Sequence, residues 1–121
     1  MPHRLPAAVR APVSDAGEAR ALALGLPGAE ERDHHGRPSF RVGGRIFATL
    51  WDATHMNVMV DEPGIHTYVA RDTLTFSEVW WGRRLAAVRV RLDRVAAEQL
   101  RELLTDAWER AAADPSALER D

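Results

Sequence analysis

The chain contains no cysteine and no lysine. The absence of cysteine excludes disulfide bonds, thiolate nucleophiles, iron–sulfur ligation and every cysteine-based zinc site. The absence of lysine excludes a Schiff base and the phosphate-binding lysine of a P-loop. All sixteen basic residues are therefore arginines. G+C-rich coding produces such a bias, and so does selection for planar groups that bind phosphate through two parallel hydrogen bonds.

Long apolar runs are also missing. No stretch approaches the roughly 18 apolar residues that a membrane span needs, and the N-terminus lacks the apolar segment of a signal peptide. We therefore expect a cytoplasmic protein without a membrane partner. The length of 121 residues and the hydrophobic content of 45% suit one modest core. We expect one domain over residues 14–113, between a flexible arm at residues 1–13 and a frayed tail at residues 114–121.

Charge is distributed unevenly along the chain, although the net charge is only −2. From Arg37 to Arg94, nine arginines accompany six acidic residues, which gives this middle a charge of +3. The remainder has seven arginines and twelve acidic residues, a charge of −5. A basic centre with acidic flanks is compatible with anion binding on one face.

Hydrophobic periodicity predicts a helix near each end of the expected domain. Asp15 and Glu18 resemble a capping box, and an apolar stripe at helical spacing follows them as far as Leu-Pro-Gly at residues 26–28. Residues 95–113 carry a second and broader stripe. A short helix is expected after Asp61, because a proline stands in its first turn.

The segments between these helices show the period of two that is typical of strands. Residues 38–42 and 45–51 flank two glycines, which is a hairpin signal. Residues 55–60 form a plausible third strand, and residues 85–92 are the clearest one. Residues 73–81 fit either an extended loop or a strand.

This order of elements predicts an α+β fold. We expect a two-layer sandwich in which the N- and C-terminal helices pack on one face of an antiparallel sheet. The other face is then open to water, and it is the natural place for a binding site.

The segment ERDHHGRPSF at residues 31–40 raises the question of a metal site, because its acidic and histidine side chains are suitable ligands. Adjacent histidines point to different sides of an element, and no His-x3-His or His-Glu-x-x-His spacing is present. We therefore expect residues 30–35 to form a solvated polar turn. Frataxin-like iron binding by carboxylates is the alternative, and it would use a sparse acidic set: Asp15, Glu18, Glu30, Glu31 and Asp33.

No catalytic motif is visible in the sequence. None of the four serines stands in a Gly-x-Ser-x-Gly elbow, and no glycine-rich phosphate loop is present. We therefore predict a protein that is not an enzyme, with no catalytic residues and no cofactor.

Strand alternation places Arg41, Arg89 and Arg91 opposite the buried residues. Arginines contact phosphates, and an exposed indole can stack on a base. The other interpretation is that these arginines only solvate the sheet, with one tryptophan in the core. The predicted nucleic-acid site consists of Arg41, Arg45, Arg83, Arg84, Arg89, Arg91 and Trp81.

Three stretches resemble the MmcQ/YjbR family of small bacterial proteins, once known only as a domain of unknown function. They are Leu-Pro-Gly at 26–28, GRPSFRVGG at 36–44, and a last helix with Leu92-Asp93 before it and Ala107-Trp108 within it. The resemblance covers about residues 16–113. The chain departs from the family pattern at two points, with residues 85–87 where an aromatic is usual and Arg45 where lysine is frequent.

The resemblance implies a CyaY-like (frataxin-like) sandwich and a role in DNA binding. The leading hypothesis is therefore a non-enzymatic DNA-binding module that uses the arginines of the open sheet face. Iron binding in the frataxin manner is one alternative. A protein–protein interaction module with no nucleic-acid role is the other. We expect a monomer or a weak homodimer.

Overall fold

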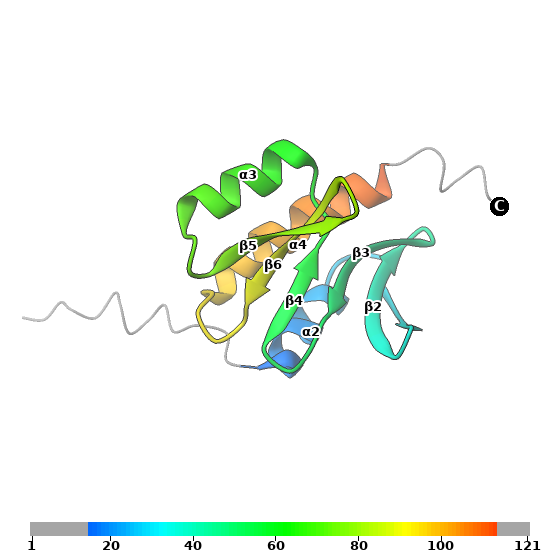
Figure 1. The fold of residues 1–121 in the computed structure, drawn as a ribbon. Coiled ribbons are helices and arrows are strands. Elements are labelled where there is room, and N and C mark those ends of the chain that lie inside the picture. Colours follow the sequence, from blue (N-terminus) through cyan, green and yellow to red (C-terminus); the bar gives the residue numbers. More distant parts are fainter. Residues whose placement is uncertain (1–14, 114–121) are drawn as a thin grey trace, which may run out of the picture.

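The computed structural model describes residues 15–113, so the predicted arm at 1–13 and tail at 114–121 lie outside the described residues. Within that range the chain forms three helices and a six-stranded antiparallel sheet with the order β1-β2-β3-β4-β6-β5 (Figure 1). This α+β architecture confirms the predicted fold class. The helices are α2 (Ala16–Leu24), α3 (Glu62–Arg71) and α4 (Ala97–Ala112). The strands are β1 (Glu30–His34), β2 (Arg37–Val42), β3 (Arg45–Leu50), β4 (His55–Val58), β5 (Phe76–Trp81) and β6 (Arg84–Arg91).

The helices cover one face of the sheet. The α4 helix packs across β2, β3 and β4, α2 lies against α4, and α3 covers β5 and β6 (Figure 1). The Asp15 side chain caps α2, as predicted, by accepting a hydrogen bond of 2.8 Å from the Glu18 amide. The Asp61 side chain caps α3 in the same way, at 2.9 Å from the Gly64 amide. No helix within residues 15–113 is long and apolar enough to cross a membrane.

The core lies between the helices and the inward face of the sheet. Antiparallel pairing puts partners on the same face, so buried residues form rows that run from strand to strand. Burial of each large apolar side chain in such rows stabilises the fold by roughly 1.5–3 kcal/mol. The two central rows are Phe40–Ala48–Val58–Val88 and Leu50–Met56–Val90–Phe76.

A bulge interrupts the pairing of β2 with β3. The partner of Phe40 is Ala48, but the partner of Arg41 is Ile46, so Phe47 has no partner on β2. The extra residue keeps Phe47 fully buried in the core while Ile46 faces the open side. Because a bulge bends its strand and increases the local twist, it curves the sheet at this point.

A second bulge lies in the β5–β6 hairpin. Val79 pairs with Ala87, whereas Trp80 pairs with Leu85, which leaves Ala86 unpaired. The two bulges therefore lie in hairpins on either side of β4.

The expectation that residues 30–35 form a polar turn is wrong. Residues 30–34 form the edge strand β1, which pairs with β2 in register from Glu30↔Arg41 to His34↔Arg37. His35 and Gly36 form the two-residue turn, with φ angles of 55° and 86°. Every residue of β1 is exposed, so this strand shows no alternation of polar and apolar residues. Histidine at the first left-handed position replaces the usual Asn or Gly, and the turn signal was missed.

The remaining strand predictions agree with the structure. The two glycines at residues 43 and 44 form the β2–β3 turn, both with positive φ. The ambiguous segment at residues 73–81 contains a strand, β5, and the expected strand at residues 85–92 corresponds to β6.

Candidate functional site

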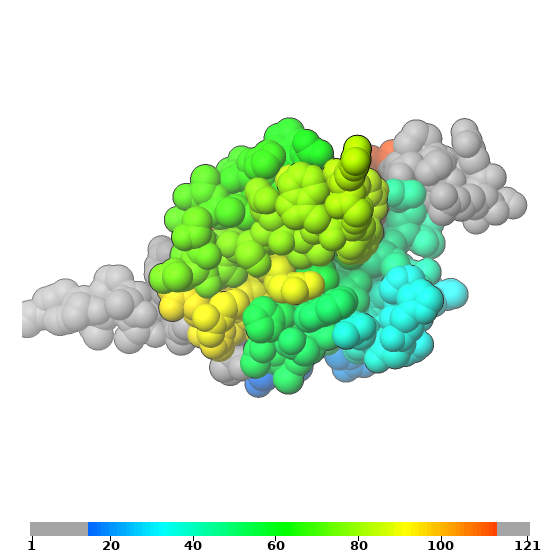
Figure 2. Space-filling view, viewed as in Figure 1, coloured from blue at the N-terminus to red at the C-terminus, as the bar shows by residue number. Residues whose placement is uncertain are grey.

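The open face of the sheet is hollowed into a cavity of about 740 Å³. Figure 2 shows this side of the molecule, with the β5–β6 hairpin on one side of the hollow and β2 on the other. We call this cavity the groove. Its walls are formed chiefly by Arg37, Arg41, Arg45, Trp51, Trp81, Arg84 and Arg110, over a floor of Ile46, Thr49, Asn57, Met59 and Ala86.

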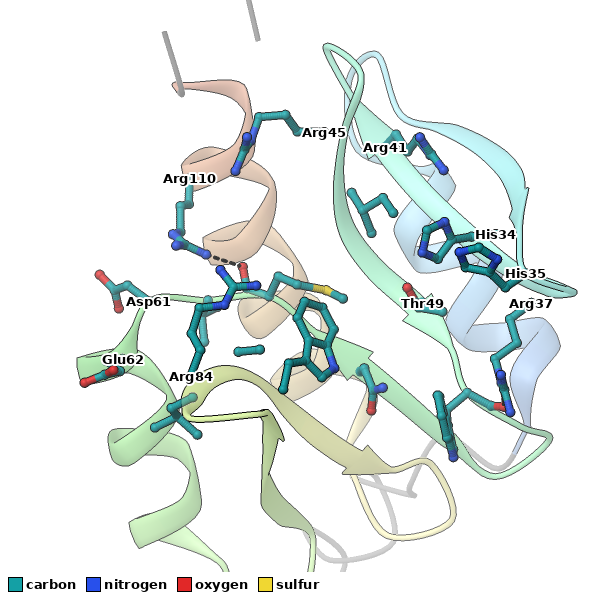
Figure 3. A pocket seen from close by; sticks show the side chains of 18 of the residues that line it. His34, His35, Arg37, Arg41, Arg45, Thr49, Asp61, Glu62, Arg84 and Arg110 are labelled. Carbon is teal, nitrogen blue, oxygen red and sulfur yellow. Dashed lines mark hydrogen bonds between the residues drawn. The ribbon is translucent and has the colours of Figure 1, made fainter. Parts of the chain in front are cut away.

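The groove is positively charged. Five guanidinium groups line it, against the two carboxylates of Asp61 and Glu62, so its charge is +3 with histidines counted as neutral. Figure 3 shows Arg45, Arg84 and Arg110 toward α4, with Asp61 and Glu62 near them. The five arginines come from β2, β3, β6 and α4, and only the tertiary fold brings them to one surface.

Trp51 is bracketed by arginines at one end of the groove. The guanidinium carbon of Arg37 lies 3.8 Å from the centroid of the Trp51 ring, and that of Arg89 lies 4.6 Å from it. Each guanidinium is also held by a hydrogen bond. Arg37 Nε donates to the Trp51 carbonyl at 2.8 Å, and Arg89 Nε donates to Asn57 Oδ1 at 2.9 Å. These bonds fix two cations and an indole that is still 36% exposed.

The β3–β4 loop holds Trp51 in place. The Trp51 amide donates to the carbonyl of His55 at 3.0 Å, which closes the loop. The Asp52 carboxylate accepts from the Thr54 amide at 2.8 Å and shares a hydrogen bond of 3.0 Å with His55 Nδ1. The Thr54 amide is the main reason why the pKa of Asp52 falls to about 2. A carboxylate with such a pKa remains charged and keeps the loop closed at neutral pH.

A second tryptophan and arginine pair lies on the β5–β6 hairpin. The Arg84 guanidinium carbon is 5.2 Å from the Trp81 ring centroid, and Trp81 is 49% exposed. Trp81 lines the groove, whereas its neighbour Trp80 does not. Trp80 Nε1 instead donates to Glu78 Oε1 at 3.0 Å. Successive residues of a strand point to opposite faces, which explains this division.

Four of the seven residues predicted from the sequence line the groove. These four are Arg41, Arg45, Arg84 and Trp81. Arg89 lies beside it, over the Trp51 ring. Two others are not among the lining residues, namely Arg83, in the turn of the β5–β6 hairpin, and Arg91, whose Nη2 lies 2.7 Å from Asp93 Oδ2.

Sequence reasoning missed Arg37, Trp51 and Arg110. Arg37 precedes a proline, and Trp51 ends the predicted strand, so neither showed an alternation that would assign it to a face. Arg110 lies on α4, where it donates from Nη1 to the carbonyl of Met59 at 3.4 Å. Nothing in the local sequence connects a helix position with the open face of the sheet.

The carboxylates proposed for iron binding are spread over α2 and the edge strand. Within residues 15–113, no three His, Asp or Glu side chains converge in the way that a metal ion requires. Asp15 caps α2, and Glu31 forms an ion pair with Arg20. Asp33 accepts a hydrogen bond of 3.3 Å from the Gly36 amide, which supports the β1–β2 turn.

Comparisons with known proteins assign this chain to a family. A search of curated proteins finds no match. Among solved structures, the crystal structure of the Deinococcus radiodurans protein DR2400, with a DUF419 domain, is similar with a TM-score of 0.72 and 19% sequence identity. The similarity covers 88% of this chain and 84% of that one, and it shows a shared fold. The model of the YjbR family matches residues 24–110, so the chain belongs to the YjbR family.

Proposed function

We propose that this protein of the YjbR family binds DNA through the groove, without catalysing a reaction. The observation that carries the proposal is the convergence of five arginines on a single concave face. They originate from separate segments of a chain whose net charge is −2. A local charge of +3 on an otherwise acidic protein is suited to a polyanion.

The chemistry of the groove supports phosphate as the main ligand group. A guanidinium presents several donors in a fixed plane and binds phosphate oxygens through charge-assisted hydrogen bonds. Arg37 and Arg89 are already oriented by their bonds to the Trp51 carbonyl and to Asn57. A preoriented arginine loses less side-chain entropy when it binds a phosphate, which favours affinity.

Fluorescence anisotropy with labelled DNA tests the proposal. The variant Arg41→Ala plus Arg84→Ala removes two charges from the groove. The control, Arg94→Ala plus Arg101→Ala, removes two charges from exposed positions outside it. Each charge-assisted bond contributes about 1.5 kcal/mol or more, so the groove variant should bind at least about tenfold more weakly.

The control variant should retain most of the affinity. An equal loss in both variants would show that DNA is attracted only by total charge, and the groove would have no special role. Absence of binding by the unmodified protein at low salt would refute the proposed function itself.

A further inference from the structure

We infer that the groove takes single-stranded DNA in preference to duplex DNA, with bases stacked on the Trp81 ring and on the arginines that bracket Trp51. This inference rests on the proposed DNA binding and narrows it to one form of DNA. It depends on three features of the groove: its concave shape, its stacking surfaces, and its neutral floor between charged walls.

The shape of the groove is suited to a flexible strand. Proteins that read a duplex directly insert a protruding helix or ribbon into a DNA groove about 12 Å wide. Here the arginines and tryptophans line a hollow of about 740 Å³. Pockets of about 300–1,000 Å³ hold small molecules and cofactors, so the hollow has room for bases. A single strand can therefore lower its bases into the hollow, whereas a duplex would contact only the rim.

The groove offers an exposed ring and guanidinium groups on which bases can stack. Trp81 is 49% exposed, and the Arg84 guanidinium carbon lies 5.2 Å from its ring centroid, so a base can reach this ring. Trp51 differs, because Arg37 and Arg89 bracket its ring, so a base would meet those guanidinium groups instead. Aromatic rings and guanidinium planes are the two kinds of group on which unpaired bases stack in proteins that bind single strands. In a duplex the base faces are already stacked on one another and are not available.

The floor of the groove separates the charged walls with neutral groups. Ile46, Met59 and Ala86 contribute apolar surface, and Thr49 and Asn57 contribute polar groups. Figure 3 shows Thr49 between Arg45, Arg84 and Arg110 toward α4 and His34, His35 and Arg37 on the other side. A strand that crosses this floor would place its bases over neutral groups and its phosphates against the arginines. Such contacts do not depend on base identity, so we expect little sequence preference.

Three labelled probes of equal length test the inference by anisotropy at one salt concentration. They are a single strand, a duplex of the same sequence, and an abasic strand that keeps the phosphates but lacks the bases. The single strand should bind at least about tenfold more tightly than either of the other two, because base stacking on aromatic rings accounts for that difference.

The outcomes separate this inference from the proposed function. Equal or tighter binding of the duplex would overturn the single-strand preference and leave DNA binding intact. Equal binding of the abasic strand would overturn base stacking. Failure of all three probes to bind would overturn the proposed function. If a nucleoside monophosphate competes as well as the strand does, the groove recognises a single nucleotide. That result would overturn the inference that its ligand is a DNA strand.

Matched tryptophan variants test whether the bases stack inside the groove. Trp81→Leu should weaken single-strand binding at least about fivefold, and Trp81→Phe should retain most of it, because a ring is preserved. Trp80→Leu is the control, since Trp80 is 53% exposed on the same strand but does not line the groove. Circular dichroism checks that each variant is folded. An equal loss in Trp80→Leu and Trp81→Leu would contradict the placement.

Discussion

Tyr68 is the only tyrosine of the chain, and it joins two helices. Its side chain is 3% exposed, its hydroxyl donates to Asp106 Oδ2 at 3.0 Å, and its ring lies 5.5 Å from that of Phe76. Burial, aided by the Asp106 carboxylate, raises the pKa of Tyr68 well above its usual value. The folded state therefore holds the phenol proton more tightly than the unfolded chain does.

This difference makes stability depend on alkaline pH. The contribution of Tyr68 is complete below about pH 10, where the phenol is protonated in both states. Above that pH the unfolded chain loses the proton first, so the free energy of unfolding should fall by up to about 1.4 kcal/mol per pH unit. Denaturant titration at several alkaline pH values measures the fall.

Because of the composition, this alkaline change in stability can be assigned to one side chain. The chain lacks lysine and cysteine, and arginine stays charged in this range, so Tyr68 is the side chain that titrates. In Tyr68→Phe the lost hydrogen bond should lower stability by about 1 kcal/mol, but the alkaline decline should disappear. A decline of equal slope in Tyr68→Phe would contradict this account.

The partners of the sheet arginines predict different roles for two neighbours on β6. Arg89 lies over Trp51, whereas Arg91 forms an ion pair with Asp93 through two hydrogen bonds of 3.2 and 2.7 Å. Arg89→Ala should weaken DNA binding severalfold, since it removes a charge beside the groove, and Arg91→Ala should change it less than twofold. Anisotropy measures both. A larger effect of Arg91→Ala would show that DNA binds outside the groove.

At the scale of elements, some parts of the fold could be predicted and others could not. The α4 helix has a long apolar stripe at helical spacing, and β6 ends in an alternation of valines with Arg89 and Arg91. Both patterns are readable from a single sequence. The β1 strand is exposed along its whole length, so no pattern marked it. The bulge at Phe47 shifts which residues face the groove, and pairing register is not visible in one strand alone.

The candidate site shows the same division. Alternation correctly placed Arg41 and Arg89 opposite the core, because the apolar residues next to them, Phe40 and Val88, are fully buried. Arg37 and Arg110 reach the groove from a strand start and from a helix, through contacts between segments distant in sequence. Such contacts depend on how the elements pack, and the local periodicity of the sequence does not predict them.

The β3–β4 loop is the element that positions Trp51, and its Asp52 can be tested. Asp52→Ala removes the acceptor for the Thr54 amide, so the free energy of unfolding should fall by about 0.5 kcal/mol, a modest value because the carboxylate is half exposed. A loosened Trp51 should also weaken DNA binding severalfold. Asp52→Asn, which keeps an oxygen acceptor, is the control, and identical losses in both variants would contradict a hydrogen-bonding role.

The lowered pKa of Asp52 also gives this loop a pH dependence. The folded chain holds the carboxylate charged down to about pH 2, below its ordinary value of 3.8. Its stabilising contribution is therefore complete above about pH 4 and is lost as the pH falls toward 2. Between those values the Asp52→Ala variant and the unmodified protein should converge in stability.

For the whole molecule, the central feature is the separation of charge. The chain has a net charge of −2, yet the groove has a charge of +3 from five arginines and two carboxylates. The acidic side chains of α2, β1 and α4 would repel a polyanion from those parts of the surface, while the groove would attract it. This arrangement should favour one orientation of bound DNA.

The salt dependence of DNA binding tests the central claim most directly. If each groove arginine neutralises one phosphate of a single strand, the slope of log affinity against log salt should be about −3.5, from roughly −0.7 per phosphate. The Arg41→Ala plus Arg84→Ala variant should make the slope less steep by about 1.4, and the Arg94→Ala plus Arg101→Ala control should leave it unchanged. A slope near zero, or the same slope in all three proteins, would contradict phosphate binding in the groove.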